Sequence, residues 1–310
     1  MRFGLVFPGQ GSQSVGMMTG YGDFPLVRQV FDEASLALGV DLWQMAAVGP
    51  IEALNLTVNT QPLMLTADVA VFRLWKSIGG PDPEVVAGHS LGEYSALVAA
   101  GALTLADAVP LVKLRAEAMQ GAVPAGSGAM AAVMGLDAES VRAACAEVAG
   151  TEVVEAVNFN EPAQTVIAGH KAAVERAADA VKARGAKRAL MLPVSAPFHC
   201  SLMHPAADAL AVALDGVEIL PPRIRVINNV DVEELKSGEG IRQSLIRQAA
   251  APVRWVETMI AFERLGVSHV FECGPGKVLS GLVKRCSPGL SGHAMNDEVA
   301  MRACLAQLSV

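Results

Sequence analysis

The sequence predicts an α/β fold, because short apolar runs alternate with segments of helical periodicity. Runs that fit buried strands lie at 2–7, 84–88, 223–227 and 269–273. Segments of helical character lie at 61–78, 91–100 and 205–215, in a stretch that ends near 250 and in one that starts at 255. A further helix starts after Thr104, which forms a capping pattern with Asp107, and runs through Arg115. We expect Pro110 to kink or interrupt that helix.

A second pattern occupies residues 126–195. Strand-like segments at 128–135, 153–158, 164–168 and 187–192 alternate with helices at 137–149 and 172–184. The resulting order, β-α-β-β-α-β, is that of a ferredoxin-like unit. We therefore predict a small α+β subdomain over 126–195, inserted into a large α/β domain that consists of 1–125 and 196–310.

The composition limits the classes of protein to consider. Apolar residues make up 52% of the 310 residues, so the chain can bury a large core. The 24 Lys and Arg against 31 Asp and Glu leave a net charge of −7, which argues against a nucleic-acid-binding protein. Five cysteines without a CxxC pair favour reduced thiols in a cytoplasmic protein over disulfides or a zinc site. No apolar run suits a membrane span or a signal peptide, and no metal or cofactor is predicted.

The strongest motif is G-x-S-x-G, formed by Gly88, Ser90 and Gly92. A predicted strand precedes it and a predicted helix follows, which is the context that a nucleophile elbow requires. The turn is tight, so side chains at the flanking glycines would clash. Ser90 would lie at a helix N-terminus, where backbone N–H groups face developing negative charge. The alternative is a plain Gly/Ser turn, which the strand–turn–helix context makes the weaker interpretation.

A serine hydroxyl needs a base to become a good nucleophile. Of the six histidines, His89 adjoins the serine, but neighbouring side chains diverge at a sharp turn, so we expect it to be structural. His199 follows the rigid segment 193–198, where the insert returns to the large domain. A residue at that position would face a cleft between the domains. His199 is the preferred base, and His204 and a structural role for either histidine remain alternatives.

The loop from Pro8 to Gln13 directly follows the first predicted strand. The carboxyl ends of strands in an open α/β sheet line the ligand crevice. One N–H from this loop and one from Leu91 would form an oxyanion hole. The alternatives are a phosphate-binding loop or a plain turn.

Arg115 lies in the middle of a helix among apolar residues. A buried guanidinium could bind a substrate carboxylate in bidentate fashion. The alternative is an arginine that faces solvent or forms an ion pair.

Four motifs occur in order along the chain: 7–13 (FPGQGSQ), 88–94 (GHSLGEY), 196–199 (APFH) and 274–279 (GPGKVL). Together they closely resemble those of the malonyl-coenzyme A:acyl-carrier-protein transacylases of type II fatty acid synthesis. The resemblance covers the chain from Phe3 to about Arg285. It implies a hydrolase-like α/β core with a parallel sheet and a ferredoxin-like insert, as the pattern along the chain also does.

The resemblance implies roles for individual residues. Ser90 corresponds to the acylated nucleophile and His199 to the general base. The oxyanion-hole N–H groups would come from two residues, Gln10 and Leu91. Arg115 would pair with the free carboxylate of the malonyl group. The family uses no triad carboxylate, so no third acid is predicted.

Further positions follow from the same resemblance. Gln248 matches a glutamine whose region orients the histidine, and Asn160 and Gln61 match positions that line the cleft. In related acyltransferase domains, Phe before the histidine accompanies malonyl and Ser accompanies methylmalonyl. Phe198 therefore favours malonyl, although some bacterial members with Ser there also use malonyl. Leu91 after the serine also fits malonyl.

The implied partners are malonyl-CoA and acyl carrier protein, and the family favours a monomer. Carrier proteins are typically acidic, and this chain is acidic too, so docking must use a local basic patch. The densest such cluster is formed by Lys182, Arg184, Lys187 and Arg188, although a solvated helix face would look the same. The acceptor is therefore expected to bind the insert.

Three other functions fit parts of the sequence. A serine esterase or thioesterase would use the same elbow with water as acceptor, but typical esterases lack Arg115 together with the 7–13 loop. The malonyl-transferring subunit of a malonate decarboxylase is a second alternative. A non-catalytic module that binds acyl thioesters is a third, and the presence of both the serine and the histidine argues against it.

Overall fold

The computed structural model describes residues 1–194 and 196–308, and two separate sheets organise them. The larger sheet has the strand order β10-β9-β1-β2-β7-β8, in which only β8 pairs antiparallel. Its strands are β1 (Phe3–Phe7), β2 (Val85–Gly88), β7 (Arg225–Ile227), β8 (Glu234–Leu235), β9 (His269–Glu272) and β10 (Ser291–Ala294). The predicted parallel α/β sheet is thus present.

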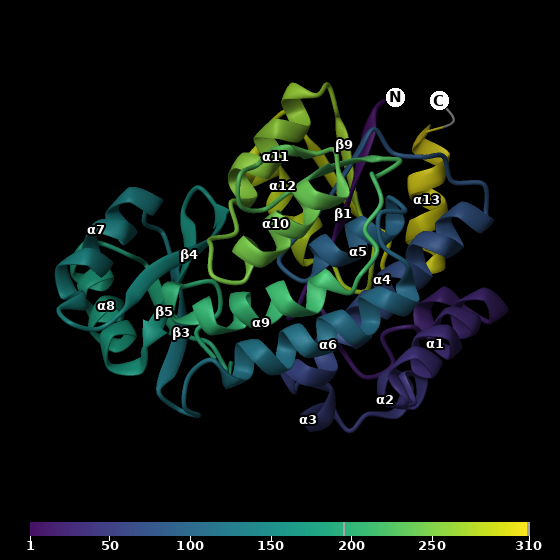
Figure 1. The fold of residues 1–310 in the computed structure, drawn as a ribbon. Helices are drawn as coiled ribbons and strands as arrows, with labels where there is room; N and C mark the ends of the chain where they lie inside the picture. The colour runs from purple at the N-terminus through teal and green to yellow at the C-terminus, as the bar shows by residue number, and fades with distance from the viewer. Residues whose placement is uncertain (195, 309–310) are drawn as a thin grey trace.

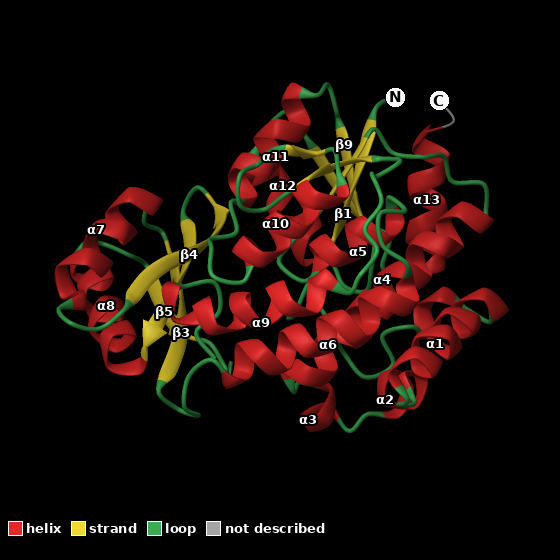
Figure 2. Ribbon diagram, in the orientation of Figure 1, coloured by secondary structure: helices red, strands yellow, loops and turns green. Residues whose placement is uncertain are grey.

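Helices surround this sheet (Figures 1 and 2). Those before the insert are α1 (Pro25–Leu38), α2 (Leu42–Val48), α3 (Ile51–Leu54), α4 (Thr57–Ser77), α5 (Gly92–Ala99) and α6 (Leu105–Gly121). Those after it are α9 (His204–Asp215), α10 (Gly238–Gln248), α11 (Trp255–Arg264), α12 (Val278–Cys286) and α13 (Glu298–Leu308). Two short 3₁₀ helices are η1 (Thr19–Tyr21) and η2 (Ser201–Met203). The sequence pattern missed α1 to α3, β8, α12, β10 and α13.

The helix α6 corrects one expectation, because Pro110 does not interrupt it. Thr104 caps its N-terminus by accepting a hydrogen bond from the Asp107 N–H at 3.1 Å. Pro110 is exposed in the second turn, and so is Ala106. The carbonyl oxygen of Ala106, which loses its helical partner at a proline, can therefore bind water. The expected interruption was therefore wrong: the freed acceptor lies on an exposed stretch of the helix, and α4 and α9 pack along it.

The smaller sheet has the order β4-β5-β3-β6, with all neighbours antiparallel. Its strands are β3 (Gly128–Met134), β4 (Val154–Glu161), β5 (Gln164–His170) and β6 (Arg188–Met191), and its helices are α7 (Ala138–Ala149) and α8 (Lys171–Ala183). This is the ferredoxin-like order predicted within 126–195. The division into two domains stays a prediction, and its boundary residue 195 lies outside the described residues.

The small sheet lies to one side of the large sheet, with α7 and α8 on its outer face (Figure 1). Its strand β4 is joined to the segment before α11 by backbone pairing. The Phe159 N–H donates to the Val253 carbonyl at 3.0 Å, and the Val253 N–H donates to the Val157 carbonyl at 2.8 Å. These bonds fix β4 against the large sheet's helices, and β4 can therefore form one wall of a cavity.

The core around the larger sheet contains buried aromatic side chains. The ring centroids of Phe3 and Phe271 lie 5.3 Å apart in a stacked arrangement, and Trp75 contacts both edge-on. All five cysteines are buried and free. Among the described residues, no helix has the length and apolar character needed to cross a membrane.

The packing of α5 onto β1 depends on a glycine. A Cβ atom at Gly92 would lie 2.0 Å from the carbonyl oxygen of Phe7, which belongs to the central strand. The nearest atoms all belong to the backbone of Phe7 and Pro8, so no side chain can move aside. Only glycine therefore fits at this position.

We expect Gly92→Ala to lower the free energy of unfolding by about 3 kcal/mol or more, because strand or helix must shift. Gly281→Ala is the matched control: Gly281 lies exposed within α12, and a Cβ there would meet no atom within 4 Å. That variant should gain roughly 0.5–1 kcal/mol from helix propensity. Denaturant unfolding of both variants measures the difference, and equal effects would contradict the packing argument.

Candidate active site

Three loops at the carboxyl edge of the large sheet form the site. Strands β1 and β2 are parallel neighbours with Phe7 opposite Gly88, so the 8–13 loop emerges beside the turn that carries Ser90. Strand β7 pairs with the other side of β2, and residues 228–229 follow it directly. Carboxyl ends of parallel strands commonly line a ligand crevice. The topology thus gathers segments that are far apart in the sequence.

The turn at Ser90 has the geometry of a nucleophile elbow. Ser90 has φ 53°, in the left-handed region that non-glycine residues rarely adopt. A Cβ at Gly88 would lie 1.8 Å from the backbone carbonyl carbon of Gly92, so the two glycines allow the strand and the helix to meet. The helix α5 then begins at Gly92, with the Ser90 side chain at its N-terminal end. The motif thus produces the strand–turn–helix unit that its spacing predicts.

The hydroxyl of Ser90 contacts the histidine preferred from sequence. Its Oγ lies 2.7 Å from Nε2 of His199. The other ring nitrogen, Nδ1, lies 3.0 Å from the Gln248 carbonyl oxygen, which can only accept a hydrogen bond. The proton is therefore assigned to Nδ1, which leaves Nε2 to accept the serine proton. The alternative base, His204, is exposed at the start of α9 and does not line the cavity.

The environment of His199 keeps its imidazole neutral. Burial, and to a smaller extent the positive charge of Arg115, lower the pKa of His199 to about 3. The side chain is only 3% exposed. A neutral imidazole is the form that can take a proton from a hydroxyl.

Arg115 is fully enclosed and aimed at the serine. Its Nη2 donates to Ser90 Oγ at 3.1 Å and to Gln248 Oε1 at 3.0 Å, and its Nη1 donates to Gln61 Oε1 at 2.8 Å. The guanidinium carbon lies 5.4 Å from the Tyr94 ring centroid, and Nε has no partner in the described residues. Burial lowers the pKa of Arg115, although Glu93 and Tyr94 oppose the shift. Two glutamines thus hold a buried cation against the serine without a carboxylate in direct contact.

Ser90, His199 and Arg115 line a cavity of about 130 Å³ that opens to solvent on one side. Its walls come from both sheets and comprise Gln10, Gln61, His89, Ser90, Leu91, Arg115, Met119, Met130, Asn158, Leu192, Val194, Phe198 and His199. Phe198 is 9% exposed and borders the cavity beside the histidine. The predicted residues Gln10, Gln61, Leu91 and Phe198 are therefore brought together with Ser90.

One residue that was expected in the cleft, Asn160, is not among the residues that line the cavity. Its Oδ1 lies 2.8 Å from Nε2 of His89. Asn158, two residues earlier on β4, lines the cavity instead. Register shifts in β4 on either side of Asn158 and Phe159 explain why the spacing of the sequence does not show which asparagine faces inward. His89 itself has the structural role expected, with its ring also packed 5.4 Å from Trp255.

Two backbone amides of residues that line the cavity have no acceptor among the described residues. These are the N–H groups of Gln10 and Leu91. The loops that carry them are in contact, because a Cβ at Gly9 would lie 3.7 Å from the Leu91 nitrogen. The Gln10 side chain is held by a 3.2 Å bond to the Thr57 hydroxyl. Unpaired amides at a helix N-terminus can receive negative charge.

Two buried residues were not predicted from sequence. Glu93 accepts hydrogen bonds from Gln248 Nε2 and from the Asn229 N–H, both at 2.9 Å. Burial raises the pKa of Glu93 to about 7, against the opposing effects of those bonds and of Arg115. The signal available for Asn229 was its position directly after a predicted strand, at the edge where sites form.

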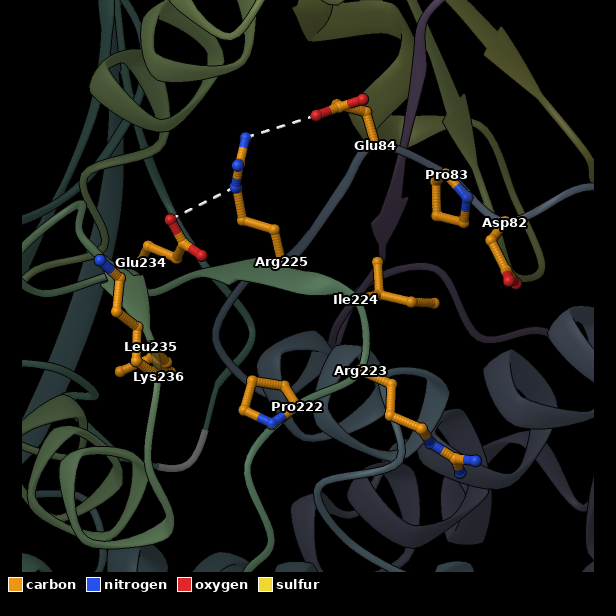
Figure 3. A pocket seen from close by; sticks show the side chains of 10 residues that line it. All are labelled: Asp82, Pro83, Glu84, Pro222, Arg223, Ile224, Arg225, Glu234, Leu235 and Lys236. Carbon is orange, nitrogen blue, oxygen red and sulfur yellow. Dashed lines mark hydrogen bonds and ion pairs between the residues drawn. The ribbon is translucent and has the colours of Figure 1, made fainter.

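A larger hollow of about 450 Å³ lies at the opposite edge of the sheet, around the amino ends of β2 and β7 (Figure 3). Its central cation, Arg225, is already paired with Glu84 at 3.4 Å and with Glu234 at 3.3 Å. Its lining contains no serine, cysteine or histidine. Nor does any group of three His, Cys, Asp or Glu side chains among the described residues offer a metal site.

The Ser90 hydroxyl is hydrogen-bonded to a neutral histidine and to a buried arginine at the carboxyl edge of a parallel α/β sheet. This combination is that of a serine-dependent acyltransferase. The model of the acyl transferase domain family matches residues 5–279. The chain is 54% identical over 305 residues to the malonyl CoA-acyl carrier protein transacylase of Escherichia coli, which covers 98% of this chain and 99% of that protein. The chain belongs to the malonyl CoA-acyl carrier protein transacylase family.

Solved structures agree with this assignment. An acyl-carrier-protein S-malonyltransferase from Burkholderia pseudomallei is 56% identical and superposes with a TM-score of 0.97, covering 99% of this chain and all of that one. A malonyl-transacylase solved in complex with its type II PKS acyl-carrier protein is 53% identical, also with a TM-score of 0.97. It covers 99% of this chain and 100% of its own.

We expect the imidazole of His199 to stay neutral well below the ordinary histidine pKa of ~6.5. As the pH falls below that value, the histidine of the unfolded chain becomes protonated while that of the folded chain stays neutral. The histidine therefore lowers the free energy of unfolding in this range. NMR titration of isotope-labelled histidine measures the pKa. In Arg115→Ala the pKa should rise but stay below the ordinary value, because burial, the larger cause, remains. A wild-type midpoint at the ordinary value would contradict the assignment.

Proposed function

We propose that this enzyme transfers the malonyl group from malonyl-CoA to the phosphopantetheine thiol of acyl carrier protein, which supplies fatty acid chain elongation. The observation that carries the proposal is the position of Ser90 Oγ, between Nε2 of His199 at 2.7 Å and Nη2 of Arg115 at 3.1 Å. A base and a fixed cation beside one hydroxyl suit an acyl group that carries a negative charge at its far end.

In the first half-reaction, His199 takes the proton of Ser90 and the serine oxygen attacks the thioester carbonyl carbon. The amides of Gln10 and Leu91 bind the oxygen of the tetrahedral intermediate, a contribution of about 3–4 kcal/mol per donor in comparable sites. The carbon–sulfur bond then breaks, and His199 returns the proton to the coenzyme A thiolate. Ser90 is left as a malonyl ester.

In the second half-reaction, His199 deprotonates the phosphopantetheine thiol, whose sulfur attacks the malonyl-serine ester. The serine oxygen leaves and recovers its proton from His199. Throughout both half-reactions the Gln248 carbonyl keeps the proton on Nδ1 and so keeps Nε2 directed at the reacting atoms. One covalent intermediate shared by two acceptors implies ping-pong kinetics.

Arg115 gives selectivity for a charged acyl group. Gln61 accepts a hydrogen bond from Nη1 and Gln248 accepts one from Nη2, which fixes the guanidinium, while Nε has no partner among the described residues. The malonyl carboxylate supplies the missing negative charge. An acetyl group would leave the buried cation without a counter-ion, which is costly. Phe198, beside the base, fills the space that a 2-methyl branch would need.

The carrier protein is proposed to dock on the small sheet near the cavity. In the basic cluster, Lys182 is paired with Asp179 and Arg184 with Glu147. Within the described residues, neither Lys187 nor Arg188 is in an ion pair. These two precede Leu192, which lines the cavity, so the free positive charges lie along the edge strand that leads to it. We further propose a monomeric, cytoplasmic enzyme.

The malonyl-transferring subunit of a malonate decarboxylase would share this acylation chemistry and differ in its acceptor. A thioesterase would deliver water to the same ester. A binding module would need neither the 2.7 Å serine–histidine contact nor the neutral imidazole. The position of Arg115 favours malonyl transfer over simple hydrolysis.

We expect Arg115→Ala to lose at least about 100-fold in malonyl transfer, because the free carboxylate loses its partner. Transfer of an acetyl group should be retained or increased. Lys113→Ala on the same helix is the control, since Lys113 pairs with the exposed Glu117 at 4.0 Å and does not line the cavity. The ratio of kcat/KM for malonyl-CoA and acetyl-CoA measures the effect. An unchanged ratio in Arg115→Ala would refute this role.

Incubation with malonyl-CoA alone should leave a stable malonyl ester on Ser90, a mass gain of roughly 86 Da, that acyl carrier protein then removes. Peptide mass spectrometry locates the ester, and Ser90→Ala should show none. Release of free malonate at the rate of coenzyme A release would indicate a thioesterase. Undiminished transfer by Ser90→Ala would overturn the proposed mechanism.

A further inference from the structure

The backbone of Ser90 needs support from outside its own turn. A serine at φ 53° is in a conformation that its local sequence does not favour. Within the turn, the Gly92 N–H donates to the His89 carbonyl at 3.0 Å and the Glu93 N–H donates to the Ser90 carbonyl at 3.1 Å. The N–H of Ser90 itself finds no acceptor within the turn, so its partner must come from another segment.

The side chain of Asn229 makes that contact. Its Oδ1 accepts a hydrogen bond from the Ser90 N–H at 2.8 Å, and its Nδ2 donates to the Gly88 carbonyl at 2.7 Å. A single planar amide thus joins the last residue of β2 to the serine, across His89. Asn229 is fully buried, so water does not compete for these bonds.

Asn229 is in turn fixed from behind. Its own N–H donates to Glu93 Oε2 at 2.9 Å, and its carbonyl accepts from the Arg254 N–H at 3.1 Å. The same Glu93 oxygen accepts from Gln248 Nε2, which also donates to the Ser90 carbonyl at 3.0 Å. Asn229 therefore bonds the Ser90 N–H and Gln248 bonds the Ser90 carbonyl, and both residues also donate to the buried carboxyl group of Glu93.

This arrangement also determines which amides remain free. Because Asn229 occupies the Ser90 N–H, that group cannot donate to a substrate oxygen. The next amide, that of Leu91, and the amide of Gln10 have no acceptor among the described residues. The asparagine thus separates an amide that supports the turn from the two that face the reacting carbonyl.

We propose that Asn229 is a positioning residue for malonyl transfer, acting through Ser90. It holds the serine backbone in its left-handed conformation, so that Oγ stays at Nε2 of His199 and only the amides of Leu91 and Gln10 face the thioester. The inference rests on the proposed function for the identity of the substrate. The effect of Asn229 on the reactivity of Ser90 does not depend on which acyl group the enzyme transfers.

The test compares Asn229→Ala with Asn228→Ala in the full chain. Asn228 is an adjacent, equally buried asparagine whose Nδ2 donates to Ser244 and Asp231 and does not contact the elbow. Single-turnover acylation by malonyl-CoA is measured over a range of concentrations. In Asn229→Ala the saturating rate should fall about 100-fold, since small misplacement of a nucleophile has effects of that size. The half-saturating concentration should change by less than about threefold, because Asn229 does not touch Arg115 or Gln61.

Asn228→Ala should lose thermal stability while keeping the saturating rate of the folded enzyme. If Asn229→Ala does not fold, Asn229→Asp replaces it: an ionised carboxylate still accepts from the Ser90 N–H but repels the Gly88 carbonyl, and the rate should also fall. A folded Asn229→Ala, or failing that Asn229→Asp, that acylates at the wild-type rate would overturn the proposal. So would a loss that appears only in the half-saturating concentration.

A second reagent separates this proposal from the proposed function. A fluorophosphonate probe reacts with an activated serine whatever the acyl specificity of the site. Its rate of reaction at Ser90 should fall in Asn229→Ala and remain unchanged in Asn228→Ala. If malonyl-CoA fails to acylate the wild type, the proposed function fails, while a lower probe rate in Asn229→Ala still supports the positioning role. An equal probe rate in wild type and Asn229→Ala overturns it.

Discussion

The hydrogen bond between Ser90 Oγ and Nε2 of His199, 2.7 Å long, is the interaction on which the site depends. It joins the large sheet, which carries the serine at the end of β2, to the segment that returns from the small sheet, which carries the histidine. Both residues have a positive φ, 53° for Ser90 and 67° for His199. Two unfavourable backbone conformations therefore meet at one contact, and the surrounding packing has to maintain both.

Burial gives this contact its chemical character. An exposed histidine would be partly protonated near neutral pH, whereas burial beside Arg115 holds His199 neutral. The same burial destabilises the charged form of Arg115. Hydrogen bonds to the two glutamine oxygens and the charge of Glu93, which does not contact the guanidinium directly, offset that cost. A buried cation without a direct carboxylate partner is suited to receive one from a ligand. The selectivity for a charged acyl group and the activation of the nucleophile thus both depend on burial.

Much of this could be predicted from the sequence, because the relevant signals are local. The elbow glycines are required by steric clashes within a few residues, and the alternation of strands and helices indicated both sheets. Elements with weaker signals were missed, among them the helices before Thr57 and the strand and helix at the C-terminal end. Pro110 was expected to kink or interrupt its helix, and the helix runs past it without interruption. Gln248 was expected to act near the histidine, and its backbone carbonyl does contact Nδ1.

The sequence by itself determined the class of fold, the identity of the serine and a short list of partners, since these depend on residue type and near spacing. Only the tertiary structure decided between His199 and His204, placed Asn158 in the cavity wall, and brought Asn229 across the elbow. The physical reason is that strand order and register place residues more than a hundred positions apart within hydrogen-bonding distance, as with Ser90 and His199 at a separation of 109. No local pattern encodes that proximity.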